Sequence, residues 1–263
     1  MNKIFFILCL LVLGVVIDAN DYGYTAYNGP ASDNEAWNSP LCKSGKLQSP
    51  INIDSSLFGN SVKNATSFVN NLPNDYKLSA KNTGETIKYT STDNSLLDFK
   101  LVRNGVEYKL QNFHFHTPSE HRINNRHSDS EIHFVFQTDL SGNASVAVVG
   151  FLLNVDITQN YALDLILNAS LVPAKINETK TIVGPNLGDF FGKTFDNKNV
   201  YQYVGSLTVP KCTEGLFWHV SGVVQPIFFR NFLNLRDIIG FSARRVQASP
   251  DHAGQPVGAS SEH

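Results

Sequence analysis

Two short stretches decide how this chain folds. They read Tyr-Lys-Leu-Gln-Asn-Phe-His-Phe-His at residues 108–116 and Glu-Ile-His-Phe-Val-Phe at residues 131–136. Side chains alternate between the two faces of a β-strand, so positions 112, 114 and 116 share one face while Phe113 and Phe115 point into apolar packing. The second stretch alternates in the same way. Both patterns predict half-buried strands with a polar face.

The polar faces carry three histidines, His114, His116 and His133. They can converge only if the two strands pair. Three neutral imidazoles with a fourth position left to solvent are typical of a catalytic zinc site, because a structural site closes that position with another protein ligand. A solvated, histidine-rich loop is the alternative, but the flanking phenylalanines and Ile132 indicate buried strands, in which three polar rings need partners. We therefore predict that the three imidazoles share one Zn²⁺.

The rest of the chain is consistent with a single, mainly β domain. Of 263 residues, 42% are hydrophobic, which is enough for a large core. The formal charge is −2 with both signs interspersed, so no basic patch favours a nucleic acid partner. Short apolar runs, such as 145–155 and 216–224, are separated by turn residues such as Asn104-Gly105 and Ser141-Gly142-Asn143. One short helix is expected near 157–170, capped by Asp156 or Thr158.

The first nineteen residues have the form of a secretory signal peptide. Lys3 precedes an apolar run from Ile4 to Ile17, and Ala19 offers a cleavage site. A membrane anchor is the alternative, but this run is short for a bilayer span. We expect a signal peptide at 1–19, a folded domain at 20–243 and a flexible polar tail at 244–263 that lacks the apolar segment of a glycolipid anchor. The mature protein is expected to be secreted, without a membrane anchor.

Cysteines and sequons agree with secretion. Cys9 leaves with the signal peptide, and in an oxidising compartment Cys42 and Cys212 most simply form one disulfide, with two free thiols as the alternative. A bridge across so long a loop stabilises by about 4–5 kcal/mol on the chain-entropy model. We expect some of four sequons to carry glycan: Asn64, Asn143, Asn168 and Asn177.

Three further segments carry a resemblance to a known family. They are Gln-Ser-Pro-Ile-Asn-Ile at 48–53, Phe-His-Phe-His-Thr-Pro-Ser-Glu-His at 113–121 and Ser-Leu-Thr-Val-Pro-Lys-Cys-Thr-Glu-Gly-Leu-Phe-Trp at 206–218. Together, in this order, they resemble the secreted, single-disulfide α-class carbonic anhydrases. The resemblance implies a twisted, mostly antiparallel sheet of about ten strands with short peripheral helices. It also implies a zinc lyase that hydrates carbon dioxide reversibly to bicarbonate and a proton, by attack of zinc-bound hydroxide.

The resemblance also implies roles around the metal. The three histidines resemble the zinc ligands, while Asn112 and Glu131 resemble partners that fix the tautomers of ligand imidazoles. Asn231 resembles the residue whose backbone carbonyl holds His116. His121 is expected to be a structural, hydrogen-bonded histidine.

Other residues resemble those that handle the substrate. Thr208 is similar to a gatekeeper whose hydroxyl accepts a hydrogen bond from the hydroxide and donates one to Glu120. Four of the remaining substrate-binding candidates resemble an apolar wall beside the metal: Val135, Val148, Leu207 and Trp218. Val209 is the fifth candidate. Val209 replaces a residue that is often threonine or histidine, so anion and sulfonamide affinity should shift.

Two positions depart further from the family pattern. Glu85 stands where relatives often have a proton-shuttle histidine, and a carboxyl with an ordinary pKa of roughly 4.3 is poorly matched to a donor near 7. Lys211 replaces the second proline of a Pro-Pro pair. Because a cis bond before a non-proline residue costs about 3 kcal/mol, we expect a trans bond between Pro210 and Lys211. The Ser49–Pro50 bond is a candidate for cis.

Two function classes remain open. One is an active secreted enzyme, and the other is a binding module that keeps the fold without turnover, as some relatives do after losing a zinc histidine. The presence of all three histidines together with Glu120 and Thr208 favours the enzyme. A secreted zinc peptidase would need a His-Glu-x-x-His helix, which the sequence lacks. The expected partners are small molecules: carbon dioxide, bicarbonate, and sulfonamide and anion inhibitors.

Overall fold

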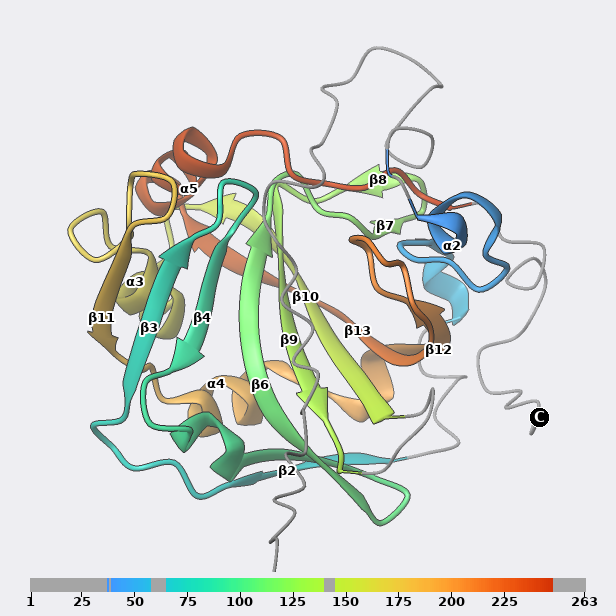
Figure 1. Cartoon of the computed structure of the whole chain (residues 1–263), viewed down its shortest axis with the longest axis horizontal. Helices are drawn as coiled ribbons and strands as arrows, with labels where there is room; N and C mark the ends of the chain where they lie inside the picture. Colours follow the sequence, from blue (N-terminus) through green and yellow to red (C-terminus); the bar gives the residue numbers. More distant parts are fainter. Residues whose placement is uncertain (1–36, 38, 58–64, 140–144, 248–263) are drawn as a thin grey trace, which may run out of the picture.

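The centre of the molecule is a ten-stranded twisted sheet (Figure 1). The computed structural model describes residues 37, 39–57, 65–139 and 145–247. The main strand order is β11-β3-β4-β6-β9-β10-β13-β12, with β5 joining β6 to β2. The strands of this sheet are β2 (Thr66–Asn70), β3 (Lys77–Asn82), β4 (Ile87–Ser91), β5 (Phe99–Arg103), β6 (Val106–His116), β9 (Ser130–Gln137), β10 (Val146–Asp156), β11 (Thr179–Val183), β12 (Val200–Ser206) and β13 (Glu214–Phe228). All strand pairs of this ten-stranded sheet are antiparallel except β10 with β13, as predicted for a mostly antiparallel sheet.

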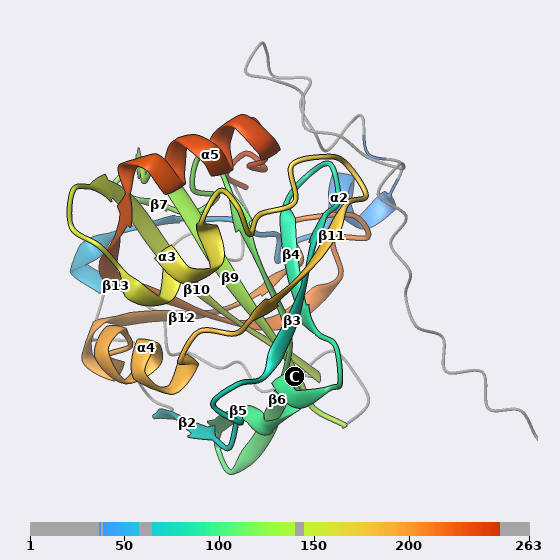
Figure 2. The same cartoon turned by 90° about the vertical axis from the view of Figure 1, so that its left-hand side faces the viewer.

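Smaller elements surround the sheet. A three-stranded sheet joins β1 (Asn52–Ile53), β7 (Arg122–Ile123) and β8 (Arg126–His127). The α-helices are α2 (Pro40–Ser44), α3 (Tyr161–Leu167), α4 (Leu187–Thr194) and α5 (Phe229–Ile239). Short 3-10 turns lie at Ser55–Leu57, Ser95–Asp98 and Asn197–Asn199. Helices α3, α4 and α5 lie on one side of the sheet and α2 on the other (Figure 2).

The main core lies between the sheet and these three helices. Phe113 and Phe115 of β6 are fully buried there, as their strand parity predicts. Aromatic rings dominate this layer, and Phe191 of α4 packs on Phe134 of β9 with ring centroids 4.8 Å apart. Because one face of β6 and of β9 packs into this core, the alternate residues of both strands face the opposite side of the sheet. The predicted histidine cluster lies on that side.

The predicted helix exists, but its cap was predicted wrongly. Helix α3 begins at Tyr161, and the side chain of Asn160 caps it by accepting from the backbone N–H of Leu163. Strand β10 runs on to Asp156, which pairs with Phe228 of β13. Because Asp156 still belongs to a paired strand, the helix begins later than predicted. The Asp156 carboxylate does not cap it and accepts a hydrogen bond from the Thr158 N–H at 2.7 Å.

The turn predicted at Asn104-Gly105 is found between β5 and β6. Asn104 and Gly105 both have positive φ, 52° and 75°, in the turn between β5 and β6. The sequons Asn168 and Asn177 are exposed, and their glycosylation stays a prediction. The expected signal peptide at 1–19, the predicted turn at 141–143 and the sequons Asn64 and Asn143 lie outside the described residues.

The predicted disulfide is present. Cys42 and Cys212 are bonded, with Cα atoms 5.1 Å apart, and both are buried. The Ser49–Pro50 bond is cis, as expected, but the Pro210–Lys211 bond is also cis, so that prediction was wrong. Tertiary contacts hold both sides of this peptide: Ser39 Oγ donates to the Lys211 carbonyl at 3.1 Å, and Cys212 is tied through its disulfide. These contacts outweigh the local preference on which the prediction rested.

One histidine far from the polar face should make stability depend on pH. His219 on β13 is fully buried, and neither ring nitrogen has a partner within ordinary hydrogen-bond geometry among the described residues. Burial, together with the charge of Arg103, lowers its pKa to about 3. The unfolded chain, with a histidine pKa near 6.5, therefore binds more protons than the folded one between these values, and the protein loses stability as pH falls from 6.5 towards 3.

We expect this histidine to cost about 2 kcal/mol of stability between pH 7 and pH 5. Urea unfolding of wild type and His219→Gln at the two pH values measures it. Between pH 7 and pH 5, the free energy of unfolding should fall by about 2 kcal/mol less in the variant than in wild type, whatever the stability of the variant at pH 7. Equal losses in both proteins would contradict the assignment.

Candidate metal centre

The three predicted histidines meet on the polar face of β6 and β9. The strands pair antiparallel with His114 directly opposite His133, which is the pairing that the prediction required. One nitrogen from each of His114, His116 and His133 lies within 4.8 Å of the other two. His116 and His133 are buried, whereas His114 is partly exposed. The cluster therefore has one side open towards solvent.

Each imidazole is held through the nitrogen that does not face the cluster. Nδ1 of His114 lies 3.3 Å from Oδ1 of Asn112, and Nε2 of His133 lies 2.8 Å from Oε1 of Glu131. Nδ1 of His116 donates to the Ser242 carbonyl at 2.6 Å. Nε2 of His116 is buried and has no hydrogen-bond partner in the described part of the chain. An unsatisfied buried nitrogen aimed into such a cluster is what a metal ligand requires.

The partner of His116 differs from the prediction. Asn231 lies on α5, where its side-chain N–H donates to Asp164 at 2.7 Å, and the carbonyl that accepts from His116 belongs to another residue. Ser242, on the segment that follows α5, provides the carbonyl instead, and its hydroxyl accepts from the Thr117 N–H. Any residue type has a backbone carbonyl, so no sequence signal distinguishes this position.

Glu131 organises the wall of the site. Its Oε1 accepts from His133 and, at 2.7 Å, from Nδ1 of His121, while its Oε2 accepts from the backbone N–H groups of Glu120 and His121. The other nitrogen of His121 lies 2.7 Å from the Tyr203 hydroxyl. His121 is therefore hydrogen-bonded at both nitrogens, in accord with a structural role. Tyr203 was not foreseen from the sequence.

The electrostatics keep two of the rings neutral. Burial lowers the pKa of His114 well below its ordinary value, and the charges of His116, His133 and Lys88 act in the same direction. Burial also lowers the pKa of His116. Metal ligation needs the neutral imidazole, so these shifts favour it.

His133 and Glu131 behave as a coupled pair. Burial opposes charge on both groups, but the carboxylate of Glu131 raises the pKa of His133. In return, the imidazoles of His121 and His133 hold the pKa of Glu131 well below its usual range against the effect of burial. Glu131 is therefore ionised, which suits a partner that accepts from a ligand imidazole.

Glu120 lies beside His116 and is completely buried. Its Oε1 accepts from the backbone N–H of Arg244 at 2.9 Å, and its Oε2 lies 3.5 Å from Nε2 of His116. Oε2 has no hydrogen-bond partner among the described residues, so the bond expected from the Thr208 hydroxyl is not formed here. Thr208 is buried, 5% exposed. Its gatekeeper role stays a prediction.

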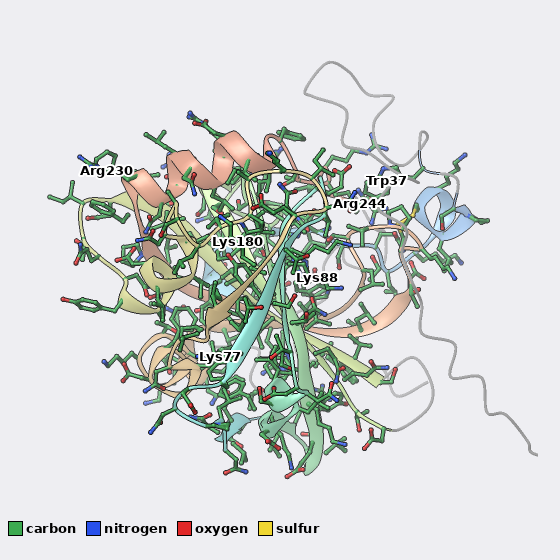
Figure 3. The ribbon with its side chains drawn as sticks, turned by 60° about the vertical axis from the view of Figure 1, so that its left-hand side comes forward. Trp37, Lys77, Lys88, Lys180, Arg230 and Arg244 are labelled. Carbon is green, nitrogen blue, oxygen red and sulfur yellow. A yellow bond between two sulfur atoms is a disulfide. The ribbon has the colours of Figure 1, made fainter. Side chains whose placement is uncertain are left out.

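Arg244 is a second residue that the sequence analysis missed. The predicted domain boundary places it first in the flexible tail, yet it is completely buried. Its guanidinium donates to the carbonyls of Ser49 and Cys42 and lies over the ring of Trp37, 5.4 Å from its centroid (Figure 3). The segment after α5 is thereby fixed in the position from which it supports His116 and Glu120.

Three of the predicted apolar residues do pack together beside the cluster. Val135, Val148 and Trp218 belong to one apolar group on this face, and the Trp218 ring lies 4.9 Å from that of His133. Leu207 and Val209 are partly exposed on either side of Thr208, and their substrate roles stay predictions. Glu85, on the turn between β3 and β4, is partly buried, and this burial raises the pKa of its carboxyl.

Comparison with known proteins agrees with this arrangement. The model of the family described as eukaryotic-type carbonic anhydrase matches residues 32–248. Alpha carbonic anhydrase 6 of Arabidopsis thaliana is 33% identical over 72% of this chain and 66% of its own length. The carbonic anhydrase of Neisseria gonorrhoeae is 34% identical over 76% of this chain and 73% of its own length.

Solved structures give the same result. An alpha carbonic anhydrase from Aspergillus oryzae has a TM-score of 0.73 at 30% identity, over 87% of this chain and 93% of its own. The enzyme from Thermovibrio ammonificans, in complex with the inhibitor sulfanilamide, has a TM-score of 0.70 at 28% identity, over 87% and 97%.

Proposed function

Because the chain belongs to the eukaryotic-type carbonic anhydrase family, we propose that it hydrates carbon dioxide reversibly to bicarbonate and a proton, with Zn²⁺ held by His114, His116 and His133. The observation that carries the proposal is the convergence of three imidazole nitrogens within 4.8 Å, one of them buried without a partner. Three nitrogen donors with one open side fit a catalytic zinc ion better than a structural one.

The donor set also decides the chemistry. Zinc, when bound, acts as a Lewis acid that lowers the pKa of water so that hydroxide forms near neutral pH, an effect for which carbonic anhydrases are the standard case. Neutral imidazoles leave the full positive charge available for this, whereas thiolates would cancel part of it. Asn112, Glu131 and the Ser242 carbonyl orient the rings.

The surrounding side chains suit the substrate. Carbon dioxide is uncharged and apolar, so Val135, Val148 and Trp218 can hold it through dispersion and exclusion of water. Thr208 and the buried carboxylate of Glu120 would orient the attacking oxygen. In this role the Thr208 hydroxyl would donate to Oε2 of Glu120, which has no hydrogen-bond partner among the described residues.

The alternative is a module that keeps the fold and binds without turnover. All three histidines and their hydrogen-bond partners are present here, and this favours the enzyme. Sulfonamide and anion inhibitors should bind, in keeping with solved relatives that hold sulfanilamide and acetazolamide.

Secretion is proposed on the sequence and the disulfide. The Cys42–Cys212 bond is in keeping with an oxidising compartment such as the secretory pathway. Within the described residues, no helix has the length and apolar character needed to cross a membrane.

The test is zinc content together with stopped-flow hydration of carbon dioxide. Purified protein should hold one zinc per chain, lose both metal and hydration activity on dialysis against a chelator, and regain both when zinc is added back. A zinc-loaded protein without hydration activity would support the binding module instead. Protein that takes up no zinc would overturn the proposal.

Proton export should limit turnover. Position 85 carries a glutamate, and although burial raises its pKa, a carboxyl starts far below the range of an efficient shuttle near neutral pH. Raising the imidazole concentration at constant ionic strength is expected to increase kcat about tenfold or more. At low carbon dioxide the effect should be smaller. High turnover that is indifferent to buffer would show that another group exports the proton.

A further inference from the structure

A row of paired residues leads from the metal centre towards the β11 edge of the sheet. The strand register sets His133 opposite His114, His114 opposite Lys88, and Lys88 opposite Lys81. Directly opposed residues of antiparallel strands project from the same face of a sheet. The two lysines therefore share the face that carries the metal-binding histidines.

Burial confirms this orientation. Ile87 and Tyr89, on either side of Lys88, are completely buried in the opposite core, and Ala80 and Asn82 flank Lys81 in the same way. Both lysines are exposed. Figure 3 labels Lys88 near the middle of this view, apart from Lys77.

The two lysines occupy directly opposed positions on paired strands, so two positive side chains are neighbours on this face. Like charges directly opposite on paired strands are destabilising. In the part of the chain that the structure describes, neither lysine makes an ion pair or a side-chain hydrogen bond. An anion placed here would relieve this repulsion.

We propose that Lys81 and Lys88 form an anion subsite on the wall of the metal centre. It takes the carboxylate or similar oxyanion group of a small ligand whose other end occupies the centre. Neighbouring strands are about 4.8 Å apart, so the subsite begins one to two strand spacings from His114, a span that one benzene ring can bridge. The inference rests on the proposed function and adds a preference for anionic ligands to it.

Two probes that differ only in a carboxylate test the subsite. Benzenesulfonamide and 4-sulfamoylbenzoate are titrated by calorimetry into the zinc-loaded wild type and into Lys81→Gln, Lys88→Gln and the double variant. Lys77→Gln is the matched control, because Lys77 is exposed on the same face of β3 but lies four residues from Lys81, or about 13 Å along the strand.

Affinity for the neutral probe should be the same in all five proteins. Affinity for the anionic probe should fall about two- to fivefold for each lysine removed, as is usual for exposed ion pairs, and should not change in Lys77→Gln. High salt should remove the difference between wild type and variants. Unchanged affinity for the anionic probe in the double variant would overturn the subsite while leaving the proposed function intact. If neither probe binds wild type, the proposed function itself fails, and the subsite with it.

Discussion

His116→Ala should abolish hydration of carbon dioxide and lower zinc affinity by more than about a hundredfold. Loss of a residue that merely orients a ligand imidazole costs about 10- to 100-fold in metal affinity, and loss of the ligand itself should cost more. His116 is also buried, with Nδ1 fixed by the Ser242 carbonyl and Nε2 without a hydrogen-bond partner among the described residues. Its removal leaves two imidazoles, too few for a stable catalytic zinc site.

Zinc content after dialysis and stopped-flow hydration measure the effect. His127→Ala is the control, because His127 is exposed on β8 and lies outside the three-histidine cluster. It should retain zinc and activity at the wild-type level. Circular dichroism of both variants separates loss of metal from loss of fold. A folded His116→Ala protein with normal zinc content would remove this residue from the ligand set.

Removal of the disulfide, in the double variant Cys42→Ser/Cys212→Ser, should lower the free energy of unfolding by about 4–5 kcal/mol. The bond joins residues 170 positions apart, so it restricts most of the unfolded chain. It also ties α2 to the segment after Thr208, where Gln48 Nε2 donates to the Cys212 carbonyl and Arg244 donates to that of Cys42.

Urea unfolding at pH 7, with and without reductant, measures this contribution. Wild type should lose the stated stability when reduced, and the double variant should not respond to the reductant. Both cysteines are buried, so the serine substitutions can change stability by themselves. Comparing oxidised with reduced wild type measures the effect of the bond without any substitution. A loss below about 1 kcal/mol would mean that the reduced, unfolded chain is already compact, and that the chain-entropy argument overstates the effect.

Local pattern was enough to predict the strands and the histidine cluster. Alternation along β6 and β9 separates Phe113 and Phe115 from His114 and His116, and the fold obeys it because one face must be buried. The disulfide followed from the two cysteines that lie outside the expected signal peptide. The ten-stranded sheet was implied by the family resemblance and not by periodicity.

Contacts made by backbone groups and contacts between distant segments could not be predicted from the local sequence pattern. The Ser242 carbonyl replaced the expected contribution of Asn231, and Arg244 proved to be part of the core and not of a tail. The cis bond between Pro210 and Lys211 was missed because the local preference for trans was the only term that could be estimated. Each of these three features depends on which distant segment of the chain packs beside it. The type of the residue itself does not specify that neighbour.

The sequence by itself therefore determined which side chains share the face that carries the three-histidine cluster, since strand parity and residue chemistry are local properties. Only the tertiary structure decided what holds those side chains in place and what stands beside them. The row that sets Lys81 and Lys88 next to His114 is the sharpest example: three residues from β3, β4 and β6 become neighbours through strand register alone. Register is fixed by how whole strands bury their apolar faces, a property of the assembled sheet and not of any one stretch.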